Sequence, residues 1–260
     1  MKILVPVKSV MDVELNIRVR DGQVVEEGMN YILSKWDENA IEAALQLKEA
    51  GEGSITVASV GPARAAEVLR KALAMGADDA VHIADAAAEG SDAFAIGRLL
   101  AAVAQRDYDL IVTGRQAQDT DLGAVPAVLG VLLDWPVVAN VVQIEAVEAG
   151  ALTVHRQGAQ GREVISLKLP AVLTASDALN EPRLASLRGI MQAKKKPFET
   201  LTLADLGVDA SQVGTAAART VLVEVLPPQG RGAGQKFEGS PAEVVPQVVA
   251  LLANEAKIFS

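Results

Sequence analysis

Residues 55–76 read ITVASVGPARAAEVLRKALAMG and combine a strand, a turn and a helix within one short stretch. The apolar run Ile55–Val60 predicts a buried strand, and the glycine–proline pair that follows ends it. Residues 63–75 have the apolar spacing of a helix, and Gly76 is the residue type that commonly caps one. A strand that turns directly into a helix is the repeating unit of α/β domains, so this stretch predicts that class.

The rest of the amino-terminal half repeats this unit. Apolar runs typical of strands alternate with segments of helical spacing, and Pro126 falls in the first turn of one expected helix, where proline is tolerated. The alternation predicts a doubly wound α/β domain with a mostly parallel sheet, of the Rossmann-like type that binds adenine nucleotides. The expected strands are Ile3–Val7, Ala80–Ile83 and Leu110–Thr113, and the expected helices are Trp36–Ala50, Ser91–Gln105 and Asp121–Leu133.

Two further regions have the pattern of β-hairpins. Within residues 17–25, Asp21-Gly22 is a tight-turn signal between two short β runs. Over residues 137–174, consecutive strand patterns replace the alternation of strand and helix, with a turn at residues 158–161. This change predicts an antiparallel hairpin added to the parallel sheet.

The carboxyl-terminal part of the chain has a different character. Residues 227–239 are rich in glycine, proline and charge and have no core pattern. A strand candidate, 221–225, precedes them, and an amphipathic helix over 241–256 follows. We therefore expect one domain over residues 1–200 and an arm over residues 201–260 that is ordered by packing on another protein.

The composition excludes several classes of function. Half of the 260 residues are hydrophobic, so a large core is available, and a net charge of −9 argues against general binding of nucleic acid. The absence of cysteine excludes disulfides, thiol catalysis and cysteine-ligated metals or clusters. No apolar run approaches the ~18 residues of a membrane span, and the first residues lack a signal-peptide pattern. These features predict a cytoplasmic protein, or a mitochondrial matrix protein in a eukaryote, without membrane insertion.

The loop GRQAQDTDLGAV, from Gly114 to Val125, is the first candidate for a functional site because it joins a buried strand to a helix. In open α/β sheets ligands bind at the carboxyl ends of strands, where a glycine admits a ligand to the backbone and a helix start offers N–H groups to phosphate. The alternative is an ordinary connecting loop, because Asp119 and Asp121 disfavour a phosphate. The sequence contains no P-loop, and its first strand is not followed by the glycine fingerprint of dinucleotide-binding proteins.

The second candidate is a presented segment between Pro182 and the lysine run 194–196. Its apolar residues Leu187, Ile190 and Met191 lie where a core role is not expected, and this arrangement favours a docking surface. The alternative is that the lysines are simply a solvated surface. Nothing in the sequence has the pattern of a nucleophile–base pair or a metal-ligand set, so no catalytic activity is expected.

A set of motifs spread over nearly the whole chain matches one known family. The motifs are VPVK at 5–8, IRV at 17–19, SVGP at 59–62, LRKALAMGAD at 69–78, GRQA at 114–117, LDWP at 133–136, LKLPAVLT at 167–174, NEPR at 180–183 and SLRGIMQAK at 186–194. In all of them the chain resembles the beta (small) subunit of electron transfer flavoproteins.

The resemblance implies a heterodimer that transfers electrons. FAD would be held mainly by the alpha subunit, while this chain would bind a structural AMP and its arm, from about Leu201, would wrap the alpha subunit. Electrons would come from flavoprotein dehydrogenases and pass to an acceptor of the electron transfer flavoprotein–quinone oxidoreductase type. The AMP-lining residues would be Pro6, Ser34, Lys35, Trp36, Asp37, Val60, Gly114, Arg115, Gln116, Ala117, Gln118, Asp119, Thr120, Asp121, Leu122, Gly123, Ala124 and Val125. The docking residues would be Leu184, Leu187, Ile190, Met191, Lys194 and Lys195, in a recognition loop over 184–195 with Leu187 as its anchor.

One departure from the family pattern concerns the phosphate loop. Many members continue this loop with polar, glycine-containing residues, whereas this chain has Leu122-Gly123-Ala124-Val125-Pro126, which leaves backbone N–H groups as the donors. A subset of the family carries a second FAD in the beta subunit and oxidises NADH by flavin-based bifurcation, and that subset needs a fuller polar loop. A rival from another class is a nucleotide-binding regulatory or hydrolytic protein on the same scaffold, for which only Asp119 and Asp121 stand out as acid–base candidates.

Overall fold

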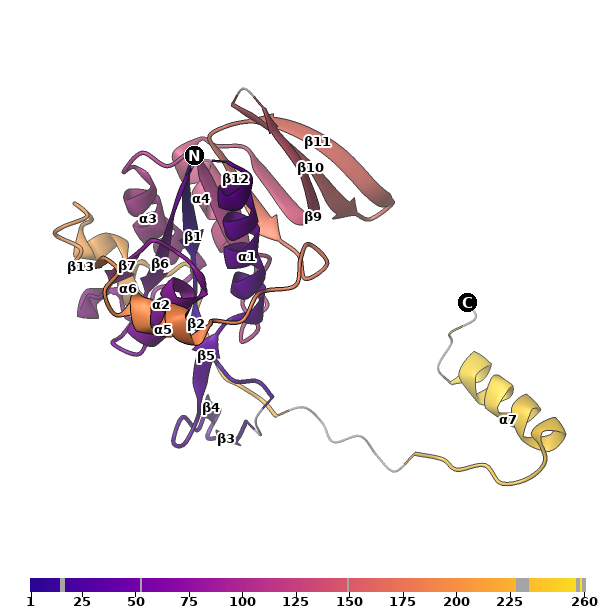
Figure 1. Ribbon diagram of the computed structural model, residues 1–260. Helices are drawn as coiled ribbons and strands as arrows, with labels where there is room; N and C mark the ends of the chain where they lie inside the picture. Colours follow the sequence, from indigo (N-terminus) through magenta and orange to yellow (C-terminus); the bar gives the residue numbers. More distant parts are fainter. Residues whose placement is uncertain (15–16, 52, 149, 228–233, 256–257, 259–260) are drawn as a thin grey trace. The chain divides into compact units, whose positions relative to one another are not determined.

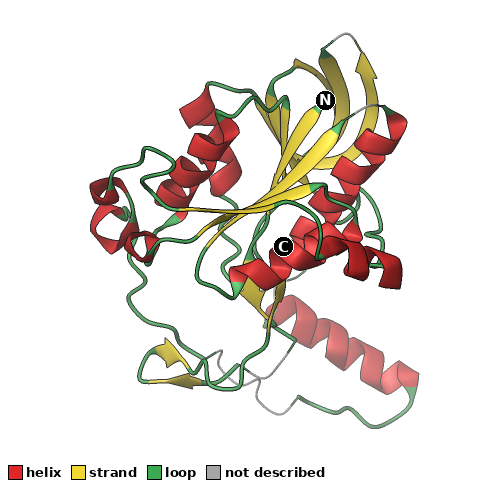
Figure 2. Cartoon of the chain, turned by 60° about the vertical axis from the view of Figure 1, so that its left-hand side comes forward, coloured by secondary structure: helices red, strands yellow, loops and turns green. Residues whose placement is uncertain are grey.

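A computed structural model describes the chain except for residues 15–16, 52, 149, 228–233, 256–257 and 259–260 (Figure 1). The chain divides into two compact units, Met1–Glu224 and Val225–Ser260. The first unit contains a central sheet with helices on both faces (Figure 2). This arrangement confirms the predicted α/β class.

Nine strands of the described residues form the central sheet, in the order β11-β10-β9-β12-β8-β1-β6-β7-β13. All pairs from β9 to β13 in that order are parallel, whereas β9, β10 and β11 pair antiparallel. The sheet is therefore mostly parallel, with the predicted antiparallel hairpin at one edge. The strands are β1 Lys2–Pro6, β6 Ser54–Val60, β7 Asp79–Ile83, β8 Leu110–Gly114, β9 Val137–Glu148, β10 Ala151–Gly158, β11 Gly161–Lys168, β12 Ala171–Ala175 and β13 Phe198–Leu201.

Helices cover the two faces of the sheet, and each face has its own core. In β1, Ile3 and Val5 pack in the cluster under α1 and α2, whereas Leu4 packs in the cluster under α3 and α4. This alternation follows from the two-residue period of a strand. The helices are α1 Lys35–Ala50, α2 Ala65–Met75, α3 Ala93–Ala104, α4 Val125–Leu133, α5 Leu187–Ala193 and α6 Gly214–Ala217, with the 3₁₀ turns η1 Ala86–Ala88 and η2 Ala210–Gln212.

Two small antiparallel ribbons lie outside the central sheet. Strand β2, Ser9–Met11, pairs with β5, Tyr31–Leu33. Strand β3, Val19–Arg20, pairs with β4, Gln23–Val24, around the predicted turn at Asp21-Gly22. Gly22 has a φ of 74°, a left-handed conformation that glycine adopts without strain.

Several sequence predictions need correction. The antiparallel addition expected over residues 137–174 does not include its last strand, because β12 pairs in parallel with β8 and β9. The strand candidate at residues 221–225 pairs with no other strand and forms none. Helix α4 begins at Val125 rather than at residue 121, since the loop before it is held by its own side chains. Helix α3 begins after Asp92, whose side chain caps it in place of the expected Ser91.

The first unit extends beyond the boundary near residue 200 that the sequence suggested. Strand β13 pairs in parallel with β7, and Leu201, Leu203 and Val213 are buried in the cluster under α3. The unit ends at Glu224 because these apolar side chains bind the residues after 200 to the core.

The second unit contains α7, Pro241–Asn254. Ser240 and Glu243 form a reciprocal capping box at its amino end. No residue of α7 is buried, and its apolar side chains Val245 and Val249 are 56% and 47% exposed. Among the described residues, no helix of either unit has the length and apolarity needed to cross a bilayer.

Asp92 joins the start of α3 to the last part of the first unit. One carboxylate oxygen accepts from the amides of Phe94 and Ala95, each at 3.0 Å, and the other accepts from the amides of Arg219 and Thr220 at 2.7 and 3.1 Å. The Arg219 guanidinium also lies 3.6 Å from the centre of the Phe94 ring.

We predict that Asp92→Ala lowers the free energy of unfolding by about 2 kcal/mol, because it removes a helix cap and two further charge-assisted hydrogen bonds. Chemical denaturation measures this loss. Asp209→Ala, which removes the acceptor for a single amide of η2, is the matched control and should cost less. Equal losses in the two variants would show that the Arg219 and Thr220 contacts contribute nothing.

Candidate functional site

The carboxyl ends of β1 and β8 form the point at which the strand order reverses. From β1 the chain continues to β6 on one side, whereas β8 lies on the other side of β1. Ligands of doubly wound sheets bind at this switch point. The start of α1 and the loop between β8 and α4 also lie there, because both are tied to the strand ends by hydrogen bonds.

Asp37, in the first turn of α1, makes those ties. Its carboxylate accepts from the Lys8 amide at 2.8 Å and from the Gly114 amide at 3.2 Å. Burial raises the pKa of Asp37 to about 7, although the two amides act to lower it. One carboxylate thus connects the segment after β1, the end of β8 and the first turn of α1.

The loop after β8 is held by its own polar side chains. Gln118 accepts from the Lys35 amide at 3.1 Å, and Gln116 donates to Asp121 at 2.9 Å. Asp119 pairs with the ammonium group of Lys8 at 2.9 Å. The two acidic residues that disfavour a phosphate therefore both have partners within the protein.

Gly114 meets the start of α1 closely. A Cβ atom at this position would lie 2.4 Å from Oδ1 of Asp37 and 2.7 Å from the carbonyl carbon of Trp36. The sequence predicted that this glycine admits a ligand, but the space beside it is filled by α1. Gly114 is needed for the contact between β8 and α1, and a ligand would approach the loop from another side.

Unpartnered buried polar atoms gather around this region. Among the described residues, five buried side-chain polar atoms lack a hydrogen-bond partner. One belongs to Arg98, and the other four are the hydroxyl oxygens of Ser9, Ser34 and Ser59 and Nε2 of Gln118. Ser34 precedes α1, Ser59 is near the end of β6, and Ser9 follows β1. Such groups are costly unless something binds them, so the arrangement fits a polar ligand.

The structure places the predicted site residues at the carboxyl ends of the parallel strands. Pro6 and Val60 end β1 and β6, Ser34 precedes α1 and residues 35–37 begin it, and residues 114–125 run from the end of β8 to the start of α4. Ser9 and Ser59 were not predicted. The available signal for Ser59 was a small polar residue near the carboxyl end of a mostly apolar strand.

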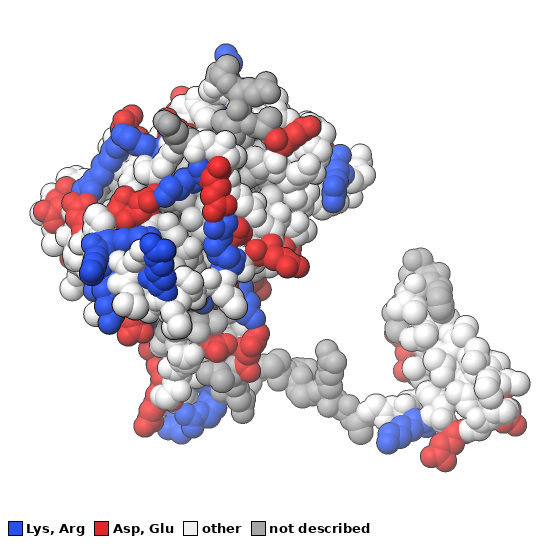
Figure 3. Space-filling view, viewed as in Figure 1, with Lys and Arg blue, Asp and Glu red and all other residues white. Residues whose placement is uncertain are grey.

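The predicted docking residues lie together on and beside α5. Leu184, Leu187 and Met191 are 92%, 83% and 72% exposed, and Ile190 is 47% exposed. Lys194 and Lys195 are exposed as well. Figure 3 shows Lys and Arg side chains gathered on the part of the first unit where α2 and α5 lie. These residues form one apolar and basic surface, which we call the docking segment, residues 184–195.

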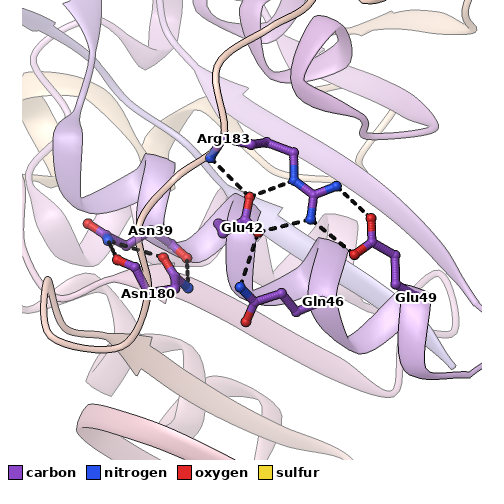
Figure 4. A network of polar contacts seen from close by, with 6 residues as sticks. All are labelled: Asn39, Glu42, Gln46, Glu49, Asn180 and Arg183. Atoms are coloured by element: carbon purple, nitrogen blue, oxygen red, sulfur yellow. Dashed lines mark hydrogen bonds and ion pairs between the residues drawn. The ribbon is translucent and has the colours of Figure 1, made fainter.

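A polar clamp fixes the chain just before this segment to α1 (Figure 4). The guanidinium of Arg183 binds Glu42 at 2.8 and 2.9 Å and Glu49 at 2.5 and 3.0 Å. Asn39 and Asn180 exchange amide hydrogen bonds beside it. Although burial opposes the shift, hydrogen bonds from Arg183 hold the pKa of the Glu42 carboxyl below its usual value.

Comparison with known proteins identifies the family. The family model described as "Electron transfer flavoprotein domain" matches residues 21–206. The chain belongs to the electron transfer flavoprotein family. It is 37% identical to the electron transfer flavoprotein subunit beta of Methylophilus methylotrophus, with 99% of each chain covered. It is 39% identical to the subunit beta of Bradyrhizobium diazoefficiens and 38% identical to that of Bacillus subtilis, with 100% of each chain covered in both cases.

Membership of the electron transfer flavoprotein family confirms the resemblance drawn from the motifs. Two of the five residues that depart from the family pattern, Gly123 and Pro126, line a cavity of about 370 Å³ on the side of the loop that faces β9 and β12. Arg115 and Gln116 line the same cavity.

We predict that the Asp37 carboxyl makes stability fall as pH rises from about 4 to about 7. Its pKa is about 7 in the folded chain and near 3.8 when unfolded, so the folded state binds the proton more tightly across this window. The stability that the proton provides is fully present below the unfolded pKa and is lost as pH rises through the folded pKa, with a slope of at most about 1.4 kcal/mol per pH unit.

Urea denaturation of the wild type and of Asp37→Asn at several pH values measures this slope. The substitution also removes one acceptor for the two amides, which lowers stability at every pH but leaves no group to titrate. The difference between the two proteins should therefore depend on pH. Parallel profiles would contradict the assignment.

We predict that Gly114→Ala destabilises the protein by about 1–3 kcal/mol, because the new methyl group must displace the start of α1. Gly51→Ala is the control, since a Cβ atom at Gly51 would have no neighbouring atom within 4 Å and its φ of −155° suits any residue. Thermal unfolding compares the two. A Gly114→Ala protein as stable as the Gly51→Ala protein would show that the loop yields freely at this point.

Proposed function

We propose that this chain is the beta subunit of a heterodimeric electron transfer flavoprotein and has no catalytic residue of its own. The alpha subunit holds most of an FAD, which accepts electrons from flavoprotein dehydrogenases and passes them to a quinone-linked acceptor in the bacterial cytoplasm. The single observation that carries the proposal is the similarity to beta subunits over the full length of the chain. The exposed docking segment is the structural feature that supports it.

We propose AMP as the ligand at the carboxyl ends of β1 and β8. The unpartnered groups of Ser34, Ser59 and Gln118 support a polar ligand there. The loop from Leu122 to Val125 offers no polar side chain, so the phosphate would be bound by backbone N–H groups near the starts of α1 and α4. The proposed role of this AMP is structural.

The docking segment supports a transient partner. Its apolar side chains are exposed, and its neighbouring lysines give the surface a positive charge in a chain whose net charge is −9. Exposed apolar anchors bind a partner, whereas charges around them mainly steer the encounter. This composition suits an acidic face of a flavoprotein dehydrogenase.

The second unit supports a permanent partner. Helix α7 has an apolar side with no buried residue, although it is well capped. We propose that α7 and the preceding residues pack on the alpha subunit, which would cover Val245 and Val249.

Co-expression with the alpha subunit, followed by extraction and mass determination of bound nucleotides, tests the proposed function. We expect a yellow heterodimer with one FAD and one AMP. Two FAD molecules would indicate the bifurcating type instead. A colourless protein that hydrolyses ATP would support the rival regulatory or hydrolytic function and overturn the proposal.

We predict that Leu187→Ala slows reduction of the heterodimer by its dehydrogenase at least ~10-fold, because an exposed apolar anchor of this size contributes about 2 kcal/mol at an interface. The flavin spectrum, the thermal unfolding curve and reduction by dithionite should not change. Val164→Ala is the control, since Val164 is also exposed, at 65%, but lies on β11. Reduction at the wild-type rate, or loss of folding, would show that Leu187 is not a docking residue.

A further inference from the structure

The docking segment is fixed to the rest of the domain at both of its ends. Arg183 lies immediately before it and is bound to α1, while Lys196 lies immediately after it and is bound to α2. Between these two anchors, Leu184, Leu187 and Met191 point into solvent. The side chains that would meet a partner therefore contribute little to holding the segment in place.

The first anchor combines backbone and side-chain contacts. The Arg183 amide and its Nε both donate to Oε2 of Glu42, at 3.1 and 2.8 Å, and its two terminal nitrogens reach both oxygens of Glu49. The Glu42 side chain is only 5% exposed, and Gln46 also donates to it at 3.1 Å. The guanidinium is thus held in one orientation by two carboxylates of the same rigid helix.

The second anchor lies at the carboxyl end of α2. The ammonium group of Lys196 donates to the carbonyl oxygens of Leu73 and Ala77, at 2.9 and 2.5 Å. Leu73 lies in the last turn of α2 and Ala77 follows its cap, and a cation is favourable at this end of a helix. Burial lowers the pKa of Lys196, which agrees with an ammonium group withdrawn from solvent.

Close packing supports the same end of the segment. Gly189 lies so near α2 that a Cβ atom there would be 2.3 Å from the carbonyl oxygen of Ala74, and Ala193 is buried. Helix α5 therefore has one side against α2 and presents the other.

We infer that Arg183 and Lys196 are positioning residues for electron transfer, which hold the docking segment in its binding conformation and do not themselves contact the partner. The inference rests on the proposed function. Its physical basis is that a segment ordered before binding loses less conformational freedom when the partner docks. Loss of either anchor should weaken docking without changing the flavin.

The two anchors differ from Lys194 and Lys195, the lysines proposed to steer the encounter, in that their charged groups are bound within the domain. Two carboxylates neutralise Arg183, and Lys196 is occupied by carbonyl oxygens, whereas Lys194 and Lys195 are exposed. Salt screens the attraction between exposed charges, but it acts less on Arg183 paired with Glu42, whose side chain is 5% exposed, and on Lys196 bound to neutral carbonyl oxygens. Anchor variants and steering variants should therefore respond differently to ionic strength.

The test uses the flavin-containing heterodimer and the flavoprotein dehydrogenase that reduces its wild-type form. KM for the heterodimer and kcat are measured at low and high salt for Arg183→Ala, Lys196→Ala and Lys194→Ala. Amide hydrogen exchange of residues 184–192 is measured in the same proteins without the dehydrogenase. Arg156→Ala, which removes an Arg–Glu pair on the distant β10–β11 hairpin, is the matched control.

We expect both anchor variants to raise KM about 10-fold at both salt concentrations, with kcat within about twofold of wild type and faster exchange in residues 184–192. Lys194→Ala should raise KM mainly at low salt and leave exchange unchanged. Arg156→Ala should match the wild type. Should Arg183→Ala fail to fold, Glu49→Gln keeps the Glu42 contact and is expected to raise KM about threefold with the same lack of salt dependence.

Two results would overturn the inference. One is faster exchange with an unchanged KM, since order in the segment would then be irrelevant to docking. The other is an effect of Lys196→Ala that disappears at high salt, because Lys196 would then act as a steering charge. Leu187→Ala separates these failures from that of the proposed function: if it also leaves reduction at the wild-type rate, the docking surface itself is wrongly assigned.

Discussion

The arrangement of the domain depends on a single buried carboxylate. Asp37 accepts amide hydrogen bonds from Lys8 and Gly114, which belong to segments far apart in the sequence. Two peptide N–H groups buried without an acceptor would be costly, and one side chain satisfies both. The same contact brings the first turn of α1 against the ends of β1 and β8, so the place at which the sheet reverses its order also becomes the place at which a ligand can bind.

Helix α1 extends this organisation to the opposite end of the domain. Its first turn carries Asp37, and its later turns carry Asn39, Glu42 and Glu49, which hold the chain before the docking segment. The helix is therefore common to the candidate nucleotide site and the docking segment. Because an α-helix is rigid over this length, the two sites keep a fixed geometry within the first unit.

Much of the fold could be predicted from the sequence because its signals are local. The strand over 55–60, the turn after it and the helix capped by Gly76 are all found, with the helix starting at Ala65 rather than at residue 63, since apolar period and turn chemistry act over a few residues. The pairing of β13 with β7 could not be predicted, because it depends on which strand edge remains free after folding. Ser91 and Asp92 are both good capping residues, and long-range contacts distinguish them: the Ser91 hydroxyl accepts from the Gly214 amide, whereas Asp92 also accepts from the amides of residues 219 and 220.

The candidate site was predicted in position but not in detail. Motifs placed the residues around Gly114 at the carboxyl end of a strand, which is where they lie. The direction in which that glycine faces is set by α1, and no local pattern carries that information. The clamp between Arg183 and α1 joins residues 141 positions apart at Glu42, so it too depends on the finished fold.

The exposed apolar side of α7 has a consequence for the amount of this protein that a cell can maintain. An unpartnered amphipathic helix is a site for aggregation and for recognition by proteases. Under the proposed function, each copy becomes durable only when an alpha subunit covers that helix. Beta chains in excess over the alpha subunit would be degraded. The amount of alpha subunit would therefore set the steady-state amount of beta subunit without any control of beta synthesis.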